Sequence, residues 1–536
     1  MRSSARRSIG VVFLLASLLA VSAIAAPAGL ARQPTSTTVA GIDVDSTTIP
    51  ELQELMDRHR LTSVQLTQFY LHRIKKLNPL LNAVITISPT ALADARAADA
   101  ARRQGDGRPL LGIPIIVKDN INTSGMPTTA GSWALAGSSP SDAFIVEQLK
   151  AAGALIIGKA NLSEWANFRS APSSSGWSGI GGQTNMPYVL DRNPCGSSSG
   201  SGVVAAADLA VAAVGTETDG SVVCPSGANS VVGIKPTVGL LSREGIVPIS
   251  ADQDTAGPMA RNVTDAAVLL GAMTGVDLAD PATTGQVAFT DYTGFLDDTA
   301  LDGAKIGFWQ EGTYDPAVSP GVDAVMQDTI ATLTAQGAIV TEITIPLTPE
   351  IGNAEFAALL CEFKTDIGVY LEDYTDPPYP QTLADLIAFN EANPELEGPW
   401  NSLIFELAEG TGGRTDPECA AARAAATPVV QAMMDELLAT YDAIIAPTNG
   451  PAWVTNSNPE EGDLDGDFST FVGSSNAAAI SGYADITVPA GYVDGLPIGV
   501  TFIGGQWDEP DLIGFAYDFE QASLVRVPPQ FIPTID

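Results

Sequence analysis

The amino-acid sequence predicts an α/β protein built on a single large mixed β-sheet with helices on both faces. Short apolar runs of strand length alternate with segments of helical periodicity along nearly the whole chain, and turns separate them. The composition agrees with a packed core, since 45% of the 536 residues are hydrophobic and only 16% are charged. Both observations favour a globular α/β domain over a disordered chain.

The first half of the chain alternates helices with buried strands. The stretch "PLLGIPIIVKDNIN" contains an apolar run with the length of a buried strand, and this run delivers Lys118, Asp119 and Asn120 at its end. The expected elements are a helix over 62–78, a helix over 91–105, this strand within 109–122, helix, turn and strand over 142–165, and a small-residue helix, short strand and glycine turn over 201–221.

The second half continues the pattern around one irregular segment. A strand over 305–309, a helix over 322–336 and a strand over 338–345 form one unit, and further strands are expected over 441–448, 485–492 and 498–505. Residues 350–425 are less regular and richer in aromatic and acidic residues, so we expect a helical cap over a site. The acidic segment 460–467 lacks the full calcium-loop pattern, which favours a solvated loop.

The N-terminus has the pattern of an export signal. Three arginines precede an apolar stretch over 9–21, and small residues over 23–25 fit a cleavage site. The competing interpretation, a membrane anchor, is disfavoured because the stretch is short. We therefore expect a signal peptide over 1–25, a linker over 26–40, one domain over 41–536, a secreted or periplasmic location, and no membrane attachment after the signal is removed.

Charge and cysteine content narrow the possible partners. The formal net charge is −36, and removal of the three arginines of the signal would leave about −39. Such a surface repels phosphate backbones, which argues against nucleic acid as a partner.

The four cysteines fit no common zinc motif, and their three possible pairings remain open. Cys195 and Cys224 flank a serine-rich strip, so a reactive thiol there is an alternative to a buried or disulfide-bonded pair.

This serine strip, residues 195–225, contains "CGSSSGSG" followed by "GTETDGSVVCP". Covalent hydrolysis needs a nucleophile, a proton acceptor and donors for an oxyanion, and glycine turns expose backbone N–H groups as donors. A purely structural glycine-serine turn is the competing interpretation. The chain has only two histidines, His59 and His72, and both belong to a helical region where surface or packing roles suit them.

With histidine set aside, lysine is the next candidate for the proton acceptor. A lysine serves as a base only when it is neutral, which requires burial that lowers its pKa. Lys118 follows the most apolar segment and ranks first, while Lys159 and Lys235 also follow apolar segments and remain rivals.

The serine strip and its continuation to "GIKPTVGLLSREG" resemble the signature of the amidase signature family. Further matches to this family are "GIPIIVKDN", "GGQTNMP", "DTAGPMAR", "APTNGPAW" and "ITVPAGYVDGLPIGVTFIGG". They cover nearly the whole chain after the export signal. Within the family, exported bacterial peptide amidases are the most similar group.

The resemblance implies a catalytic triad. Ser221 corresponds to the nucleophile, Ser197 to a bridging serine with a cis peptide bond, and Lys118 to the terminal base. The backbone amides of Thr218, Asp219, Gly220 and Ser221 correspond to the oxyanion hole, and Ser198 to a supporting hydroxyl. Many members carry two glycines before the nucleophile, so Asp219 is a departure that either perturbs the hole or turns its carboxylate away.

The implied function is an exported amidohydrolase that converts carboxamides, peptide C-terminal amides or small amino-acid amides first, to carboxylate and ammonia. The resemblance implies no metal and no organic cofactor, and we expect a monomer or homodimer that hydrolyses a small-molecule or peptide amide. Two alternatives are weighed against it. One component of an amidotransferase for tRNA-linked acids would share the signature but conflicts with export and the acidic charge. A non-catalytic secreted binding protein conflicts with an intact triad.

Overall fold

The computed structural model describes residues 36–170, 174–455 and 473–535, and Thr37–Asp536 forms one compact unit. The predicted export signal, nearly all of the predicted linker and the acidic segment 460–467 lie outside the described residues. Within the described ranges, no helix combines the length and hydropathy needed to cross a bilayer.

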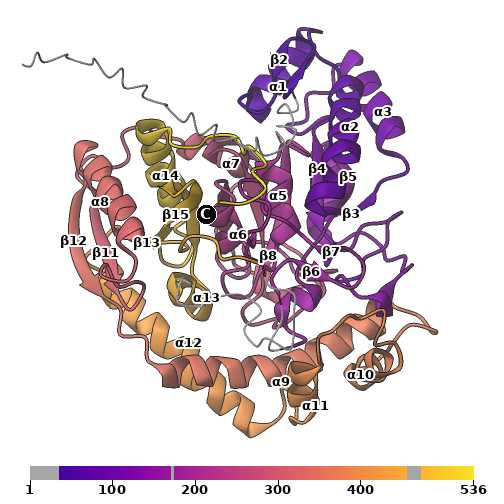
Figure 1. Ribbon diagram of the computed structural model, residues 1–536, viewed down its shortest axis with the longest axis vertical. Coiled ribbons are helices and arrows are strands. Elements are labelled where there is room, and N and C mark those ends of the chain that lie inside the picture. Colours follow the sequence, from indigo (N-terminus) through magenta and orange to yellow (C-terminus); the bar gives the residue numbers. More distant parts are fainter. Residues whose placement is uncertain (1–35, 171–173, 456–472, 536) are drawn as a thin grey trace, which may run out of the picture. The chain divides into compact units, whose positions relative to one another are not determined.

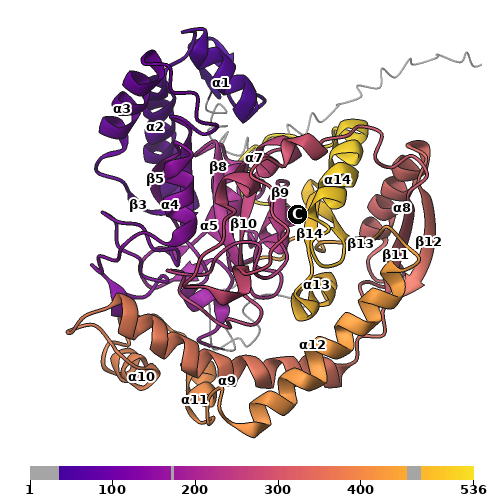
Figure 2. The same ribbon diagram turned by 180° about the vertical axis from the view of Figure 1, so that it is seen from behind.

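A mixed sheet of eleven strands forms the centre of this unit (Figures 1 and 2), which confirms the predicted fold class. The strand order is β12-β11-β13-β15-β14-β9-β10-β8-β4-β5-β3. The strands are β3 (Val84–Ile87), β4 (Pro114–Lys118), β5 (Leu155–Ala160), β8 (Ala212–Glu217), β9 (Val232–Lys235), β10 (Thr255–Ala260), β11 (Lys305–Glu311), β12 (Ile339–Thr344), β13 (Ala443–Pro447), β14 (Asp485–Val493) and β15 (Leu496–Ile503).

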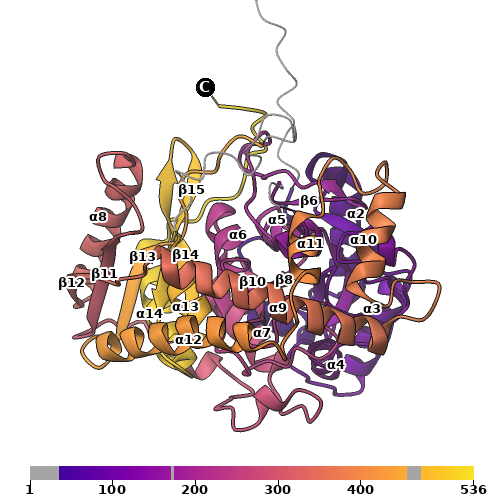
Figure 3. The ribbon, with the colours of Figure 1, turned by 90° about the horizontal axis from the view of Figure 1, so that it is seen from below.

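Helices cover both faces of the sheet. α5 and α6 pack against one face, whereas α4, α7 and α14 lie on the other, as Figure 3 shows. The helices are α1 (Ile49–Asp57), α2 (Ser63–Leu81), α3 (Ala91–Arg103), α4 (Phe144–Ala151), α5 (Ser199–Ala206), α6 (Val223–Ala228), α7 (Val263–Met273), α8 (Pro320–Ala335), α9 (Pro349–Tyr374), α10 (Leu383–Ala392), α11 (Leu403–Glu409), α12 (Pro417–Leu438), α13 (Asn476–Ser481) and α14 (Glu509–Ser523).

The segment over 350–425, which we expected to be a helical cap, contains α9, α10, α11 and the start of α12. α9 and α12 lie side by side along one end of the sheet (Figures 1 and 3). α9, α10 and α11 bury a second core, in which Phe363 of α9 and Phe405 of α11 stack at 5.4 Å between ring centroids. These helices therefore form a firmly packed layer and not a loose cover.

The register of two central strands creates the site. β4 and β8 are buried along their whole length, as expected for strands with helices on both faces, so both are apolar until their last residues. They run parallel, and Val117 is paired with Val214. The polar residues that end the two strands, Lys118 on one and Thr216 and Glu217 on the other, are therefore brought to the same edge of the sheet.

Candidate active site

A chain of hydrogen bonds joins the three residues that the sequence assigns to catalysis. Lys118 Nζ lies 2.8 Å from Ser197 Oγ, and Ser197 Oγ lies 3.0 Å from Ser221 Oγ. Lys118 and Ser197 are fully buried, whereas Ser221 keeps 9% of its surface exposed. The peptide bond between Gly196 and Ser197 is cis. The hydrogen-bond chain thus runs from two fully buried side chains to a serine that keeps a small exposed surface.

The other partners of Lys118 fit a neutral amine. Besides Ser197, its Nζ contacts Thr216 Oγ1 at 2.9 Å and Thr216 O at 3.2 Å, and Asn120 donates to the same Thr216 hydroxyl at 2.9 Å. A neutral amine has two N–H donors and one lone pair. When the amine is neutral and both N–H groups donate to Thr216, its lone pair can accept the proton of the Ser197 hydroxyl, whereas the ammonium donates to all three oxygens.

Burial makes the neutral form of Lys118 accessible near neutral pH. Burial lowers the pKa of Lys118 to about 7, although the carboxylates of Asp254 and Glu217 pull it upward. A base whose pKa lies near the working pH is the arrangement that general base catalysis favours.

The rival lysines have other partners. Lys159 is buried against Asp119, with Nζ 3.3 Å from the carboxylate, and donates to Thr128 at 2.7 Å. Lys235 donates to the backbone carbonyl of Tyr483 at 2.5 Å. Neither contacts a serine of the strip. His59 and His72 are both exposed, the first beyond the end of α1 and the second on α2, in agreement with the surface roles predicted for them.

Glu217 holds the turn that carries Ser221. Its Oε1 accepts the N–H of Gly220 at 2.9 Å, and its Oε2 accepts those of Val222 at 2.6 Å and Val223 at 3.0 Å. Gly220 has a φ of +74°, a conformation that glycine adopts without strain. The N–H of Gly220 is therefore already engaged, which corrects the expectation that it is a free oxyanion donor. The described residues offer no acceptor to the N–H groups of Thr218 and Asp219.

The side chain of Asp219 turns away from the turn's N–H groups. Its Oδ1 accepts a hydrogen bond of 2.5 Å from Ser475 Oγ, and burial raises its pKa well above the ordinary value. The sequence left two possibilities for Asp219, namely that it perturbs the oxyanion hole or that its carboxylate turns away. The structure has the second, with the carboxyl group held by Ser475. The neighbouring Thr218 hydroxyl donates to Asp254 at 2.5 Å, which fixes the other side of the turn.

The remaining serines of the strip support the backbone. Ser198 Oγ donates to Thr216 O at 3.0 Å and accepts the N–H of the same residue at 3.1 Å. The Ser198 hydroxyl therefore holds the backbone of Thr216, the residue that Lys118 also contacts. Ser199 and Ser201 lie in the first turn of α5 and donate to the carbonyls of Cys195 and Val214. In the stretch over 171–177, Ser174 Oγ donates to Gln183 Oε1 at 2.9 Å, and Ser175 Oγ accepts from Asn167 Nδ2 at 3.5 Å.

The four cysteines form two disulfides, which settles the pairing that the sequence left open. Cys195 is bonded to Cys224, and Cys361 to Cys419. No thiol remains free, so a reactive cysteine beside the serines is excluded. The first disulfide ties the segment before Ser197 to the helix after Ser221, and the second ties α9 to α12.

A cavity of about 250 Å³ adjoins the lysine end of the hydrogen-bond chain. Asn120, Thr216, Thr218 and Asp254 are among its lining residues, but neither Ser197 nor Ser221 is. The scissile bond of a substrate must reach Ser221, so this cavity is not where that bond lies. No group of three or more side chains suited to holding a metal ion occurs among the described residues.

Comparison with known proteins places this geometry in a family. The family model described as Amidase matches residues 65–513. The chain belongs to the amidase signature family. This amidase is 46% identical to the native peptide amidase of Stenotrophomonas maltophilia, whose structure aligns with a TM-score of 0.85 over 91% of this chain and 99% of that one.

Two curated relatives show the breadth of the family. A protein of Arabidopsis thaliana named "Probable amidase" is 41% identical to this amidase over 91% of the chain and 92% of its own length. A component of the glutamyl-tRNA(Gln) amidotransferase of Symbiobacterium thermophilum is 33% identical over 88% of the chain and 96% of its own length. The amidase is thus an enzyme acting on amide bonds, and the identity of the amide is the open question.

Proposed function

We propose that this amidase hydrolyses peptide C-terminal amides or small amino-acid amides to carboxylate and ammonia through an acyl-enzyme. The hydrogen-bond chain from Lys118 through Ser197 to Ser221 carries the proposal, because it supplies both a nucleophile and a route for its proton. The likeness to the peptide amidase of Stenotrophomonas maltophilia supports this choice of amide.

The proposed acylation step moves one proton along the chain. Ser221 Oγ attacks the carbonyl carbon of the amide while its proton passes to Ser197 Oγ, and the proton of Ser197 passes to the neutral amine of Lys118. The carbonyl oxygen becomes an oxyanion, which we assign to the N–H groups of Thr218 and Asp219. One donor of this kind is typically worth about 3 to 4 kcal/mol.

Collapse of this intermediate breaks the carbon–nitrogen bond. The ammonium of Lys118 returns its proton through Ser197 to the leaving nitrogen, which departs as ammonia, and Ser221 holds the acyl group as an ester. Water then attacks the ester carbonyl and gives its proton to the same chain. The proton returns to Ser221 Oγ as the carboxylic acid is released, and the acid then loses its own proton to solvent to become the carboxylate. The enzyme thus ends in its initial state.

A panel of amides tests this proposal. Ammonia release is measured from a peptide C-terminal amide, an amino-acid amide, an aliphatic amide and glutamine, with wild type and Ser221→Ala. We expect the first two to be hydrolysed fastest by wild type and none by the variant. Fastest turnover of the aliphatic amide, or release that persists in Ser221→Ala, would overturn the assignment.

The same panel separates the alternatives. A component of an amidotransferase would prefer glutamine and copurify with its partner proteins, whereas we expect activity from the isolated chain. The net charge of −36 supports this expectation, since it opposes tRNA binding. A binding protein on the same scaffold would not react with a fluorophosphonate, whereas we expect such a probe to label Ser221.

We also propose that the amidase is exported. Both disulfides support an oxidising compartment, because such bonds are rare in the reducing cytosol. Cell fractionation followed by N-terminal sequencing tests this. Mature chain in the periplasm or medium, beginning near residue 26, is the expected result, and intact chain confined to the cytosol would contradict it.

A further inference from the structure

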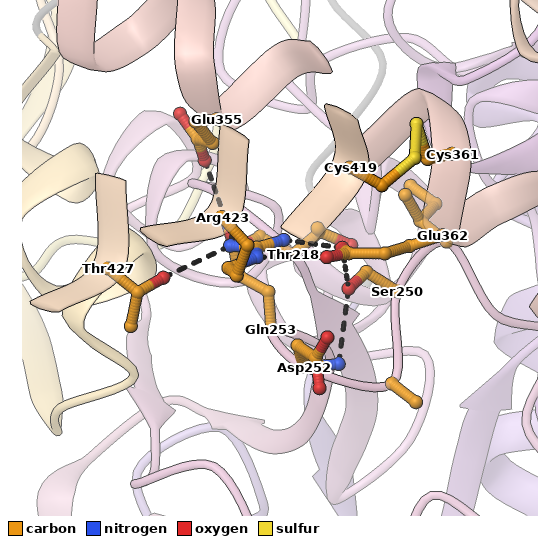
Figure 4. A network of polar contacts seen from close by, with 12 residues as sticks. Thr218, Ser250, Asp252, Gln253, Glu355, Cys361, Glu362, Cys419, Arg423 and Thr427 are labelled. Carbon is orange, nitrogen blue, oxygen red and sulfur yellow. Dashed lines mark hydrogen bonds and ion pairs between the residues drawn. A yellow bond between two sulfur atoms is a disulfide. The ribbon is translucent and has the colours of Figure 1, made fainter. Parts of the chain in front are cut away.

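Gln253 links the helical layer of α9 and α12 to the turn that carries the nucleophile (Figure 4). Its side chain is 1% exposed and lies just before β10. Nε2 donates to the backbone carbonyl of Thr218 at 3.0 Å and to Glu355 Oε1 at 2.6 Å, while Oε1 accepts from Arg423 Nη1 at 2.8 Å. Glu355 belongs to α9 and Arg423 to α12.

These partners permit only one orientation of the carboxamide. A flipped amide would turn its oxygen toward the Thr218 carbonyl and the Glu355 carboxylate, and its NH₂ group toward a guanidinium. Each of those contacts would be repulsive, because acceptors would face acceptors and donors would face donors. The Nε2–H group on the Thr218 carbonyl is therefore held in place by charged residues of two helices.

The helices that hold Gln253 are themselves fastened to each other. Arg423 pairs with Glu362 of α9 at 2.9 and 2.5 Å, and Ser250 donates to the same carboxylate at 2.6 Å. The Cys361–Cys419 disulfide joins α9 and α12 beside this ion pair (Figure 4). The network is thus a largely buried connection with many hydrogen bonds, of the kind that rigidifies a structure.

The carbonyl that Gln253 holds determines where a neighbouring N–H points. The peptide between Thr218 and Asp219 is not among the cis bonds of the described residues, so it is trans. In a trans peptide the C=O and N–H groups point in opposite directions. Drawing the Thr218 carbonyl toward Gln253 therefore turns the N–H of Asp219 away from Gln253. That N–H has no acceptor among the described residues.

We propose that Gln253 is a positioning residue that aims the N–H of Asp219 at the oxyanion of the reaction, with α9 and α12 holding Gln253 in place. This inference rests on the proposed function, because it assumes that an oxyanion forms at Ser221. It gives the helical layer a role in the chemical step that goes beyond covering the site. It also explains why residue 253 is a glutamine, because an amide N–H can donate to the carbonyl of Thr218 and a carboxylate cannot.

The test compares Gln253→Met with Gln431→Met. Gln431 lies on α12 and also donates Nε2 to a backbone carbonyl, that of Ser481, at 2.9 Å, so its variant controls for loss of one such bond. Kinetic constants are measured for a peptide amide by ammonia release. We expect kcat of Gln253→Met to fall about 10- to 100-fold with KM changed less than about twofold, since one donor is misaimed and not removed.

Inhibitor binding distinguishes positioning from a general structural effect. A peptide aldehyde forms a tetrahedral adduct whose oxygen occupies the oxyanion position, whereas the matching peptide acid does not. In Gln253→Met, affinity for the aldehyde should fall in parallel with kcat, and affinity for the acid should not change. An unchanged kcat, or a fall in kcat without loss of aldehyde affinity, would overturn the proposal.

A second pair of variants covers the case in which Gln253→Met does not fold. Arg423→Lys keeps a charge near Glu362 but lacks the fork that also reaches Gln253. Its control is Arg414→Lys, because Arg414 joins Asp366 of α9 to Asp252 without touching Gln253. We expect the loss of kcat at constant KM only in Arg423→Lys, and equal effects in both would refute the inference.

The proposed function and the role of Gln253 fail differently. If wild type releases no ammonia from any amide of the panel, the proposed function fails and the inference fails with it. If wild type is active and both Gln253→Met and Arg423→Lys keep its kcat, only the inference fails.

Discussion

The backbone N–H of Ser198 donates a hydrogen bond of 3.1 Å to the carbonyl oxygen of Ser221. The turn that precedes α5 and the turn that precedes α6 are therefore joined through main-chain atoms, independently of their hydroxyls. Gly202 permits this approach, because a Cβ at that position would lie 2.8 Å from the carbonyl oxygen of Pro225. The 3.0 Å spacing of the two hydroxyls is thus built into the backbone.

The first prediction concerns the proposed base. Lys118→Met should lower kcat/KM by about 100- to 10,000-fold, the range that general base catalysis contributes. The fold should survive, because folding must either deprotonate this amine or bury its charge, and a thioether has neither free-energy cost. Steady-state kinetics and thermal unfolding measure the two effects. Lys364→Met is the control, since Lys364 donates to the carbonyls of Glu409 and Thr411 and pairs with the Glu409 carboxylate at the end of α11. Activity retained in Lys118→Met would exclude Lys118 as the base.

The second prediction is the pH dependence of activity. Because the pKa of Lys118 is about 7, the neutral amine becomes scarce below that value, and kcat/KM should fall about tenfold per pH unit in acid. A profile of kcat/KM between pH 5 and 9 measures this. A flat profile down to pH 5 would contradict a neutral lysine as base.

One variant identifies the group whose protonation causes the fall of kcat/KM in acid, the acidic limb of the pH profile. The carboxylate of Asp254 raises the pKa of Lys118, so Asp254→Asn should move the limb to lower pH. A shift to higher pH, or no shift, would assign the limb to another group.

The pKa of Lys118 also affects stability, with a definite sign. Its folded value is about 7 and its ordinary value is 10.5, so between these values the unfolded chain binds more protons than the folded one. The contribution of Lys118 to the free energy of unfolding therefore rises with pH from about 7 to 10.5. Measured by denaturant unfolding, the difference between wild type and Lys118→Met should grow in favour of wild type over this window.

The sequence was sufficient to predict the sheet and to select the three side chains that the structure joins in one hydrogen-bond chain. Apolar runs of strand length ended in polar residues at 118 and 217, and the family motifs then distinguished Lys118 from its rivals. The arrangement around them was harder to foresee. Pairing of Cys195 with Cys224 and contact of Gln253 with Thr218 depend on how distant segments meet, and spacing along the chain carries no such information.

The engagement of the Gly220 N–H by Glu217 was missed for a different reason. A carboxylate three residues before a glycine turn is a local pattern, and side chains of this kind often accept N–H groups of the following turn. The family motif drew attention to the backbone of 218–220 as a set of donors. Only the coordinates show that one of these donors is already used to build the turn.

The third prediction follows from this turn. Glu217→Gln replaces one carboxylate oxygen with an NH₂ group, so the three N–H groups that Glu217 accepts cannot all be satisfied. Loss of a buried acceptor costs about 1 to 3 kcal/mol, which denaturant unfolding would detect. We also expect the rate of fluorophosphonate labelling at Ser221 to fall at least about tenfold, since a displaced nucleophile reacts poorly. Labelling at the wild-type rate would show that the turn does not need this carboxylate.

The fourth prediction separates the two disulfides. Removal of either pair, as Cys195→Ala with Cys224→Ala or Cys361→Ala with Cys419→Ala, should destabilise the fold by about 2 to 4 kcal/mol, because both crosslinks constrain long loops in the unfolded chain.

The two disulfides should differ in their effect on the nucleophile. Only the Cys195–Cys224 pair borders both serines of the hydrogen-bond chain. We expect its removal to lower the labelling rate of Ser221 about tenfold, through displacement of one hydroxyl from the other. Removal of the second pair should change that rate less than about twofold, because Arg423 still fastens α12 to Glu362 of α9. Equal labelling rates in the two double variants, at matched stability, would show that the crosslink beside the serines acts on the fold alone.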